Sequence, residues 1–279
     1  MTAIIDSPAR AAARAGGEGE WIERLALRDL HAAAGDDLRA RLGLGLHEVG
    51  GALVSVVARD PNIVLNRAHG LGLATPATPE ALAEIVDLYE AAGVDRYFVH
   101  VHPQAEPAAL GTWLAAKGLA PARGWMKFAR GRQAPPEVET SLHVARVGPE
   151  FANAFGRIAG RAFGFSQAGG ELVGGLAGQP GWWLYMTFDG DEPVGTGALR
   201  IEGDVAWFDY GATRPDYRCR GSQGALLARR IRDALDLGCR HLVTTTGEAV
   251  PGDPQHSYRN LERFGFEPAY RRDNFAPDG

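Results

Sequence analysis

The 279-residue sequence is poor in cysteine and contains no long apolar segment. Its two cysteines, Cys219 and Cys239, are too few for the disulfide framework of a small secreted protein. No apolar run approaches the roughly 20 residues that cross a bilayer, and the first residues lack a basic segment followed by an apolar one. We therefore expect a cytoplasmic protein with no membrane partner.

Net positive charge is also missing, because the formal net charge is −5. A chain with this balance has no overall basic field that would attract nucleic acid, so we expect no nucleic-acid partner. The apolar content of 45% and the charged content of 23% are ordinary for a globular protein. A length of 279 residues is long for one domain and sufficient for two.

The chain is organised around a glycine-bearing stretch that begins at Arg218. Residues 205–211 before it are rich in aromatic side chains and predict a strand. Apolar residues after it recur at helical spacing, at Leu227, Ile231, Ala234 and Leu235. Gly238 is expected to end this helix. A short loop between a strand and a helix directs several backbone N–H groups toward one point, at the positive end of the helix dipole, and this predicts a phosphate site.

The motif Arg218-x-x-Gly221-x-Gln223 resembles the Q/R-x-x-G-x-G/A loop of the GNAT superfamily of acetyl-CoA-dependent N-acetyltransferases, which holds the pyrophosphate of coenzyme A. Gln223 departs from that pattern, in which Gly or Ala is usual, but Gly224 follows at once. A segment N-L-E-R-F-G-F at 260–266 adds to the resemblance. The resemblance implies acetyl-CoA (CoA) as the cofactor. The expected cofactor contacts are Tyr210, Gly211, Ala212, Thr213, Arg218, Cys219, Arg220, Gly221, Ser222, Gln223, Gly224, Ser257 and Asn260.

An earlier segment, R-A-H-G-L-G at 67–72, matches R-x-x-G-x-G more closely than the later loop does. The helix after it should begin near Thr78 and Pro79, since Thr can cap a helix and Pro fits its first turn. Residues 73–77 separate Gly72 from that cap, so the amides of this segment would not lie at a helix N-terminus. We expect a strand and a turn here rather than a cofactor site.

Two parts of the chain read alike, which indicates an internal duplication. Gly93 and Gly118 in the first part correspond to Gly238 and Gly265 in the second, at nearly constant offsets. Each half predicts strands and then helix, strand, helix and strand, an α/β arrangement (α+β, with a mixed sheet) that resembles two tandem GNAT-like domains. The expected parts are a flexible N-terminal arm (1–22), a degenerate GNAT-like domain (23–132), a linker (133–140) and an acetyl-CoA-binding GNAT catalytic domain (141–279).

The acid and the base of the expected reaction are assigned to the second half. The family often has a Tyr where this chain has Leu261, so Tyr258 on the same helix face is the candidate acid, with packing as the alternative. Many members have a Glu at the position of Trp207, so Asp209, on the same strand face, is the candidate base, with a salt-bridged aspartate as the alternative. Positioning alone can supply much of such a rate.

The acceptor pocket is expected to be lined by aromatic residues and by a glycine-rich loop at 164–181. The candidate substrate contacts are Phe165, Trp182, Tyr185 and Trp207. Arg271 and Arg272 are expected at a solvated edge. His100 and His102 share a strand face without a third ligand nearby, so we expect no metal site.

These observations predict an acyltransferase that moves an acetyl group from acetyl-CoA to the amine of a small, partly apolar molecule, by direct attack on the thioester. Two alternatives stay open. One is a non-catalytic acyl-CoA-binding or regulatory protein, and the other is a transferase of a different acyl group on the same fold. A monomer and a homodimer are equally compatible with the sequence.

Overall fold

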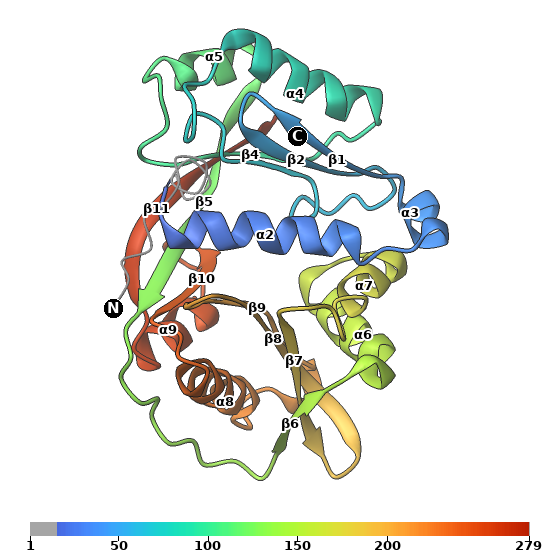
Figure 1. Ribbon diagram of the computed structural model, residues 1–279, viewed down its shortest axis with the longest axis vertical. Helices are drawn as coiled ribbons and strands as arrows, with labels where there is room; N and C mark the ends of the chain where they lie inside the picture. The colour runs from blue at the N-terminus through green and yellow to red at the C-terminus, as the bar shows by residue number, and fades with distance from the viewer. Residues whose placement is uncertain (1–15, 279) are drawn as a thin grey trace.

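The computed structural model describes residues 16–278 (Figure 1). Most of the predicted N-terminal arm, 1–22, lies outside this range, and its described end is helical from Glu18 onward. The helices are α2 (Glu18–Ala32), α3 (Asp36–Leu42), α4 (Pro79–Ala91), α5 (Leu110–Ala116), α6 (Ala152–Phe163), α7 (Gln167–Gly174), α8 (Ser222–Asp236) and α9 (His256–Arg263), with short 3-10 turns η1 (Pro149–Phe151) and η2 (Pro215–Tyr217). None of these described helices combines the length and the apolar character that a membrane crossing requires.

The strands form one mixed sheet with the order β1-β2-β3-β4-β11-β5-β10-β9-β8-β7-β6. They are β1 (Leu44–Val49), β2 (Ala52–Val57), β3 (Arg67–His69), β4 (Phe98–Val101), β5 (Leu119–Arg130), β6 (His143–Val147), β7 (Trp182–Asp189), β8 (Glu192–Glu202), β9 (Val205–Thr213), β10 (His241–Gly247) and β11 (Glu267–Pro277). The expected α/β fold with a mixed sheet is confirmed.

The two halves exchange their last strands. The final strand of the chain, β11, pairs antiparallel with β4 and β5 of the first half. In return, β5 lies between β11 and β10 and pairs antiparallel with β10. The edges of the two halves are therefore interlocked, and residues 131–140, without regular structure, lead from β5 into the second half. The domain boundaries themselves stay a prediction.

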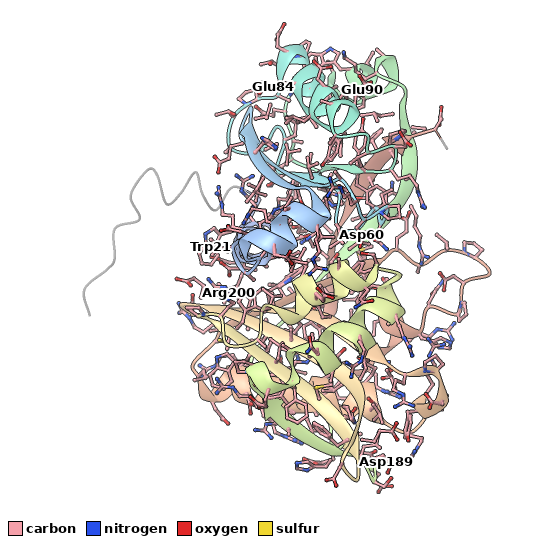
Figure 2. All side chains as sticks on the ribbon, turned by 90° about the vertical axis from the view of Figure 1, so that its right-hand side faces the viewer. Trp21, Asp60, Glu84, Glu90, Asp189 and Arg200 are labelled. Atoms are coloured by element: carbon pink, nitrogen blue, oxygen red, sulfur yellow. The ribbon has the colours of Figure 1, made fainter. Side chains whose placement is uncertain are left out.

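Helix α2 lies between the two halves, as Figures 1 and 2 show. Its apolar residues Ile22 and Leu30 belong to the core that Phe155 of α6, Leu172 of α7 and the sheet of the second half form. A carboxylate of α2, Asp29, accepts hydrogen bonds from Arg200 Nε at 2.5 Å and from Trp182 Nε1 at 3.0 Å. The first described helix thus completes the core of the second half.

The prediction of a glycine-rich loop at 164–181 is wrong, because helix α7 occupies residues 167–174. Ser166 caps this helix by accepting a hydrogen bond from Gly169 N at 3.0 Å. The glycines serve close packing of α7 on α6: a Cβ at Gly170 would lie 2.7 Å from the carbonyl oxygen of Gly156, and a Cβ at Gly156 would clash with Gly170. A composition that is typical of a loop therefore specifies a helix–helix contact here.

The expectation of a solvated edge at Arg272 is also wrong. Because β11 is an internal strand, Arg272 is fully buried, whereas its neighbour Arg271 is exposed and paired with Asp273. His100 and His102, which were expected to share one face of a strand, are buried as well. His100 Nδ1 lies 2.6 Å from Asn274 Oδ1, and His102 Nδ1 accepts from Gln104 N at 3.0 Å.

The early glycine segment forms a strand and a turn, as predicted. Thr78 caps α4 by accepting a hydrogen bond from Ala81 N at 3.1 Å. Before that cap, the carbonyl of Gly72 accepts from Glu106 N at 2.8 Å, and a Cβ at Gly72 would lie 2.6 Å from Glu106 O. The backbone of Glu106 therefore packs directly against the turn at Gly72.

Candidate active site

The sheet opens between two parallel strands of the second half. Strands β9 and β10 pair from Val205–His241 to Phe208–Thr244, and from Thr245 to Gly247 strand β10 pairs with β5 but no longer with β9. The end of β9 is further distorted by a bulge, since Tyr210 and Gly211 together oppose Gly197 of β8. Tyr210 has φ 48°, a left-handed conformation that is rare for a bulky residue. A notch therefore opens beside residues 209–213.

A buried cation supports this bulge. The guanidinium of Arg230 on α8 donates to the carbonyl of Ala198 at 3.0 Å and to the carbonyl of Asp209 at 3.2 Å. Gly197 leaves room for it, because a Cβ there would lie 2.7 Å from Arg230 Cζ. Burial lowers the pKa of Arg230 to about 10, so the side chain is still charged at neutral pH. The carbonyl of Asp209 is thereby fixed below the notch.

Helix α8 starts where the phosphate loop was predicted. Gly221 precedes it with φ 83°, and no side chain caps the helix, so its first N–H groups are left for another acceptor. Gln223 takes a role of its own: its Nε2 donates to the carbonyl of Ala212 at 2.7 Å and to Thr213 Oγ1 at 3.0 Å. The departure from the family motif therefore ties the helix start to the end of β9.

The segment between the halves passes over this loop. Thr140 Oγ1 donates to the carbonyl of Arg220 at 2.7 Å, and a Cβ at Gly221 would lie 3.2 Å from the carbonyl oxygen of Glu139. Val138 packs against the apolar core under α8. Residues 136–139 consequently form one wall of the site.

A cavity of about 1210 Å³ joins the notch, the loop and α9. Four basic side chains from the loop and from α9 line it, which are Arg218, His256, Arg259 and Arg263. Uncapped amides together with this charge suit an anionic group such as a phosphate. The arginines of α9 were missed by sequence reasoning, although their spacing at i and i+4 on a short helix was visible.

The predicted cofactor residues gather at this cavity with one exception. The ones that line it are Tyr210, Gly211, Ala212, Thr213, Arg218, Cys219, Gly221, Ser222, Gln223, Gly224, Ser257 and Asn260. Arg220 is not among the lining residues, because its guanidinium pairs with Asp189 at 2.9 Å. Whether the lining residues contact a cofactor stays a prediction.

The candidate base, Asp209, lies at the notch and lines the cavity. Trp207 Nε1 donates to its Oδ2 at 3.0 Å, and Tyr210 N donates to its Oδ1 at 2.8 Å. Burial raises the pKa of Asp209, and these two hydrogen bonds counteract part of the rise. A carboxylate that two donors hold in place, and whose pKa is raised, is suited to accept a proton.

The candidate acid, Tyr258, is placed less favourably. Its ring packs edge-on against Phe128 at 4.8 Å, and it is absent from the cavity lining, whereas Leu261 of the same helix is present. The packing alternative for Tyr258 fits this geometry. Other hydroxyl groups do line the cavity, including those of Ser257 and Thr245.

Of the four predicted substrate contacts, Trp207 lines the cavity. The other three are packed elsewhere. Tyr185 is fully buried and donates to Asp233 Oδ2 at 2.7 Å, and Trp182 is bonded to Asp29. Phe165 stacks on Phe163 at 5.6 Å, and it is Phe163 that reaches the cavity. Aromatic composition marked the region, but it did not separate side chains that face the cavity, such as Trp207, from those that pack in the core.

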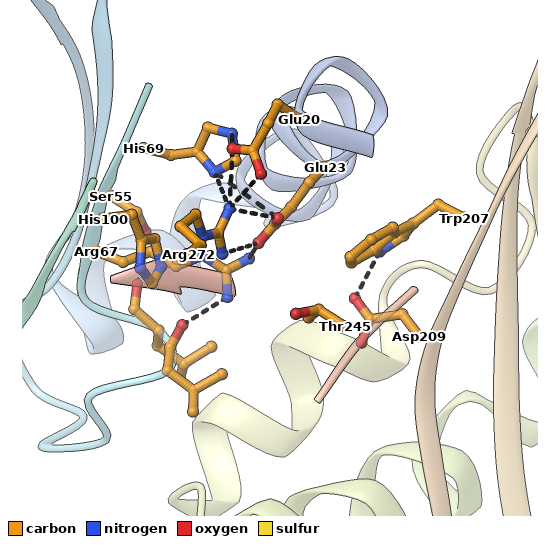
Figure 3. Close-up of polar contacts among 12 residues, drawn as sticks. Glu20, Glu23, Ser55, Arg67, His69, His100, Trp207, Asp209, Thr245 and Arg272 are labelled. Carbon is orange, nitrogen blue, oxygen red and sulfur yellow. Dashed lines mark hydrogen bonds and ion pairs between the residues drawn. The ribbon is translucent and has the colours of Figure 1, made fainter. Parts of the chain in front are cut away.

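The first half supplies the remaining wall. Glu23 of α2, Val64, Arg67 of β3 and Trp125 of β5 all line the cavity. Figure 3 shows Glu23 and Arg67 on one side and Trp207 with Asp209 on the other. None of these residues was predicted from the sequence to line the pocket.

Comparisons with known proteins agree with this arrangement. Residues 157–266 match the model of the acetyltransferase (GNAT) family. A GCN5-related N-acetyltransferase from Kribbella flavida is similar in structure, with 18% identity, a TM-score of 0.63, and coverage of 94% of this chain and 96% of that one. No curated protein matches the chain in sequence.

Two further solved structures are similar over nearly their full length. A GCN5-related N-acetyltransferase from Sphaerobacter thermophilus has 18% identity and a TM-score of 0.57, with coverage of 97% and 93% of the two chains. A tandem GNAT protein from the clavulanic acid biosynthesis pathway has 16% identity and a TM-score of 0.53, with coverage of 92% and 93%. At these identities the similarity establishes the fold.

Proposed function

We propose that the protein is an acetyl-CoA-dependent N-acetyltransferase of small amines, because residues 157–266 match the model of the GNAT acetyltransferase family and the whole chain is similar in fold to a tandem GNAT protein. One observation carries the proposal. A single cavity of about 1210 Å³ runs from the uncapped start of α8 to the carboxylate of Asp209 in the open sheet. It joins a place for a phosphate-bearing cofactor to a place for an amine.

The chemistry of the cavity fits coenzyme A. The N–H groups that follow Gly221 have no side-chain cap, and Arg218 and Arg259 line the same cavity. These groups would hold the phosphates, and the backbone of 210–212 at the bulge would face the acyl end. When bound, acetyl-CoA supplies an acetyl thioester, whose sulfur leaves as a thiol while the acetyl carbon gains a bond to the amine nitrogen.

The protein's own residues prepare the amine. An ammonium group at the notch would donate to Asp209, and the raised pKa of that carboxyl favours the transfer of a proton from nitrogen to oxygen. Trp207 orients the carboxylate, and Arg230 fixes the backbone under it. Walls from both halves exclude water from the reacting groups.

A specific observation supports a second candidate, an acyl-CoA-binding protein without turnover. Leu261 lines the cavity where a proton-donating Tyr is frequent in the family, and Gln223 occupies the carbonyl of Ala212. Both features would weaken catalysis more than binding. A transferase of another acyl group is the third candidate, and mass spectrometry of ligand carried through purification would identify the acyl group.

Calorimetry of CoA binding to the full chain tests the proposal. We expect Gly221→Glu to reduce the affinity at least about 30-fold, because a carboxylate would enter the phosphate loop. Gly70→Glu is the matched control: Gly70 also has positive φ, at 91°, and lies in the earlier segment. Melting curves of both variants separate misfolding from lost binding. Equal losses would contradict a single cofactor site.

Turnover is measured as free thiol released from acetyl-CoA in the presence of an amine panel. Amine-dependent release supports the transferase. Tight CoA binding without release from any amine would contradict it and favour the binding protein.

A further inference from the structure

Four buried charges beside the cavity neutralise one another. Glu20 and Glu23 of α2 face Arg272 of β11, as Figure 3 shows. They also face Lys127 of β5, and none of the four residues is more than 2% exposed. Arg272 Nη1 donates to Glu20 Oε2 at 3.0 Å and to Glu23 Oε2 at 2.8 Å, and Lys127 is bonded to Glu23. The oxygens of Glu20 and Glu23 and the nitrogens of His69 lie close enough to surround a metal ion, but the two cations already supply the positive charge there.

The positive charge of Arg67 is not needed to neutralise Glu20 and Glu23, because Lys127 and Arg272 already do so. Its Nη1 donates to the carbonyl of Val64 at 3.0 Å, and its closest ion-pair contact is a long one, 3.9 Å to Glu23 Oε1. Its Nε is buried and has no hydrogen-bond partner within residues 16–278, and only 8% of the whole residue is exposed. A buried N–H without an acceptor is unfavourable, so a cavity-lining guanidinium in this state is prepared for an anion.

Asp209 is the complementary charge in the same cavity. Both of its oxygens accept hydrogen bonds from neutral donors, Trp207 and Tyr210. Among the described residues, no cation forms an ion pair with Asp209. Burial raises the pKa of Asp209, and the positive charge of Arg67, whose own ion-pair contact is with Glu23, acts against this rise from a distance. Two opposite charges thus face one cavity from different halves of the chain without meeting.

We propose that the acceptor is a small zwitterion, an amine that also carries a carboxylate, whose carboxylate binds Arg67 while its ammonium lies at Asp209. This rests on the proposed function and narrows its substrate class. A zwitterion supplies an anion to the unpartnered guanidinium and a cation to the carboxylate, and it does so without changing the net charge of the site.

The rest of the wall is apolar. Trp125, Phe163 and Trp207 line the cavity near the two charges, and the guanidinium of Arg67 lies 5.7 Å from the centre of the Trp125 ring. These surfaces suit a side chain of moderate size with little polarity. An α-amino acid with an apolar or aromatic side chain combines all three features.

The test compares each amino acid with its own amide, which keeps the amine and the side chain but removes the carboxylate. The panel contains the common L-amino acids, with L-phenylalanine, L-phenylalaninamide and phenethylamine as the first set. We expect kcat/KM for the preferred acid to exceed that for its amide by about 10- to 100-fold, the worth of a charge-assisted hydrogen bond. Amides that react as well as acids would overturn the inference and leave the transferase intact.

The variant Arg67→Gln removes the charge and keeps a polar side chain. We expect the acid-to-amide ratio to fall to within about two-fold, mainly through KM for the acid. Arg59→Gln is the matched control, since Arg59 is an exposed arginine of the same half outside the cavity. A merely structural role of Arg67 would lower acid and amide turnover equally and keep the ratio, and that result contradicts the inference.

A binding readout separates this inference from the proposed function. Melting curves of the CoA-loaded protein with L-phenylalanine, and with the rest of the panel, need no turnover. Stabilisation by acids that Arg67→Gln abolishes supports the zwitterion site even where no acetyl transfer occurs. A panel in which no acid stabilises the wild type more than its amide does would overturn it.

Discussion

Arg272 and Glu23 form a bidentate ion pair between the last strand and the first described helix, with distances of 2.8 Å and 3.1 Å from its two Nη atoms to the two carboxylate oxygens. The pair is fully buried and crosses from β11, the exchanged strand, to α2, which packs on the second half. It therefore joins the ends of the chain at the place where the halves interlock.

We expect Arg272→Met to lower the free energy of unfolding by about 3–5 kcal/mol, because it leaves Glu20 and Glu23 buried with one cation fewer. Urea unfolding of the full chain measures this. Arg271→Met is the control: that side chain is exposed and paired with Asp273, so its effect should stay within about 0.5 kcal/mol. Similar losses of unfolding free energy in both variants would show that the buried ion pair contributes no more to stability than the exposed one.

Stability should fall in acid in two stages. Burial lowers the pKa of His100 well below 6.5 and that of His31 to about 4. These histidines therefore bind protons in the unfolded chain at a pH at which they stay neutral in the folded chain. The free energy of unfolding declines as the pH falls below about 6.5. Burial alone would raise the pKa values of Glu20 and Glu23, but Arg272 and Lys127 hold them well below 4.5, so their contribution is lost as the pH falls below that value. Melting temperatures from pH 8 to pH 3 measure both stages, and a flat profile would contradict them.

Asp209→Asn should reduce kcat by about 10²- to 10⁴-fold, the usual contribution of a general base. In the wild type, burial raises the pKa of Asp209, so the acid limb of kcat/KM should lie above the pH expected of an exposed aspartate. Trp207→Phe removes a hydrogen bond that lowers this pKa, and the limb should then move to higher pH. A limb that persists unchanged in Asp209→Asn would exclude the carboxylate as its origin.

Removal of the cationic side chains that line the cavity should weaken CoA binding in a salt-dependent way. We expect about 3- to 10-fold losses for Arg218→Ala and for Arg259→Ala at low salt, and smaller losses at high salt. Arg220→Ala is the control, because that guanidinium is engaged by Asp189 outside the cavity lining. Calorimetry at two salt concentrations measures the three variants, and a loss in Arg220→Ala as large as in the others would contradict the assignment.

The local part of the site was predictable because its signals are local. The aromatic strand, Gly221 and the helical spacing after it lie within one short stretch. Gly238 follows the helix with φ 86°, as expected. The order helix, strand, helix and strand that the sequence predicts at the end of each half is present in both halves, as α4-β4-α5-β5 and as α8-β10-α9-β11.

The remainder depends on contacts between distant residues, which no local pattern contains. The burial of Arg272 follows from the position of β11 inside the sheet, and the exposure of Arg67 to the cavity follows from how the halves meet. Helix α7 was mistaken for a loop because Gly170 and Gly174 have low helix propensity, and only the partner α6 explains them.

The strand exchange makes a prediction about fragments. Because β5 lies between β11 and β10, residues 133–279 alone would leave β10 without its antiparallel partner and β11 without either neighbour. We therefore expect neither 1–132 nor 133–279 to fold alone, whereas the two co-expressed fragments should form a 1:1 complex that binds CoA as the intact chain does. Size-exclusion chromatography, circular dichroism and calorimetry measure this. A monomeric, folded 133–279 with full CoA affinity would show that β5 is dispensable for the site.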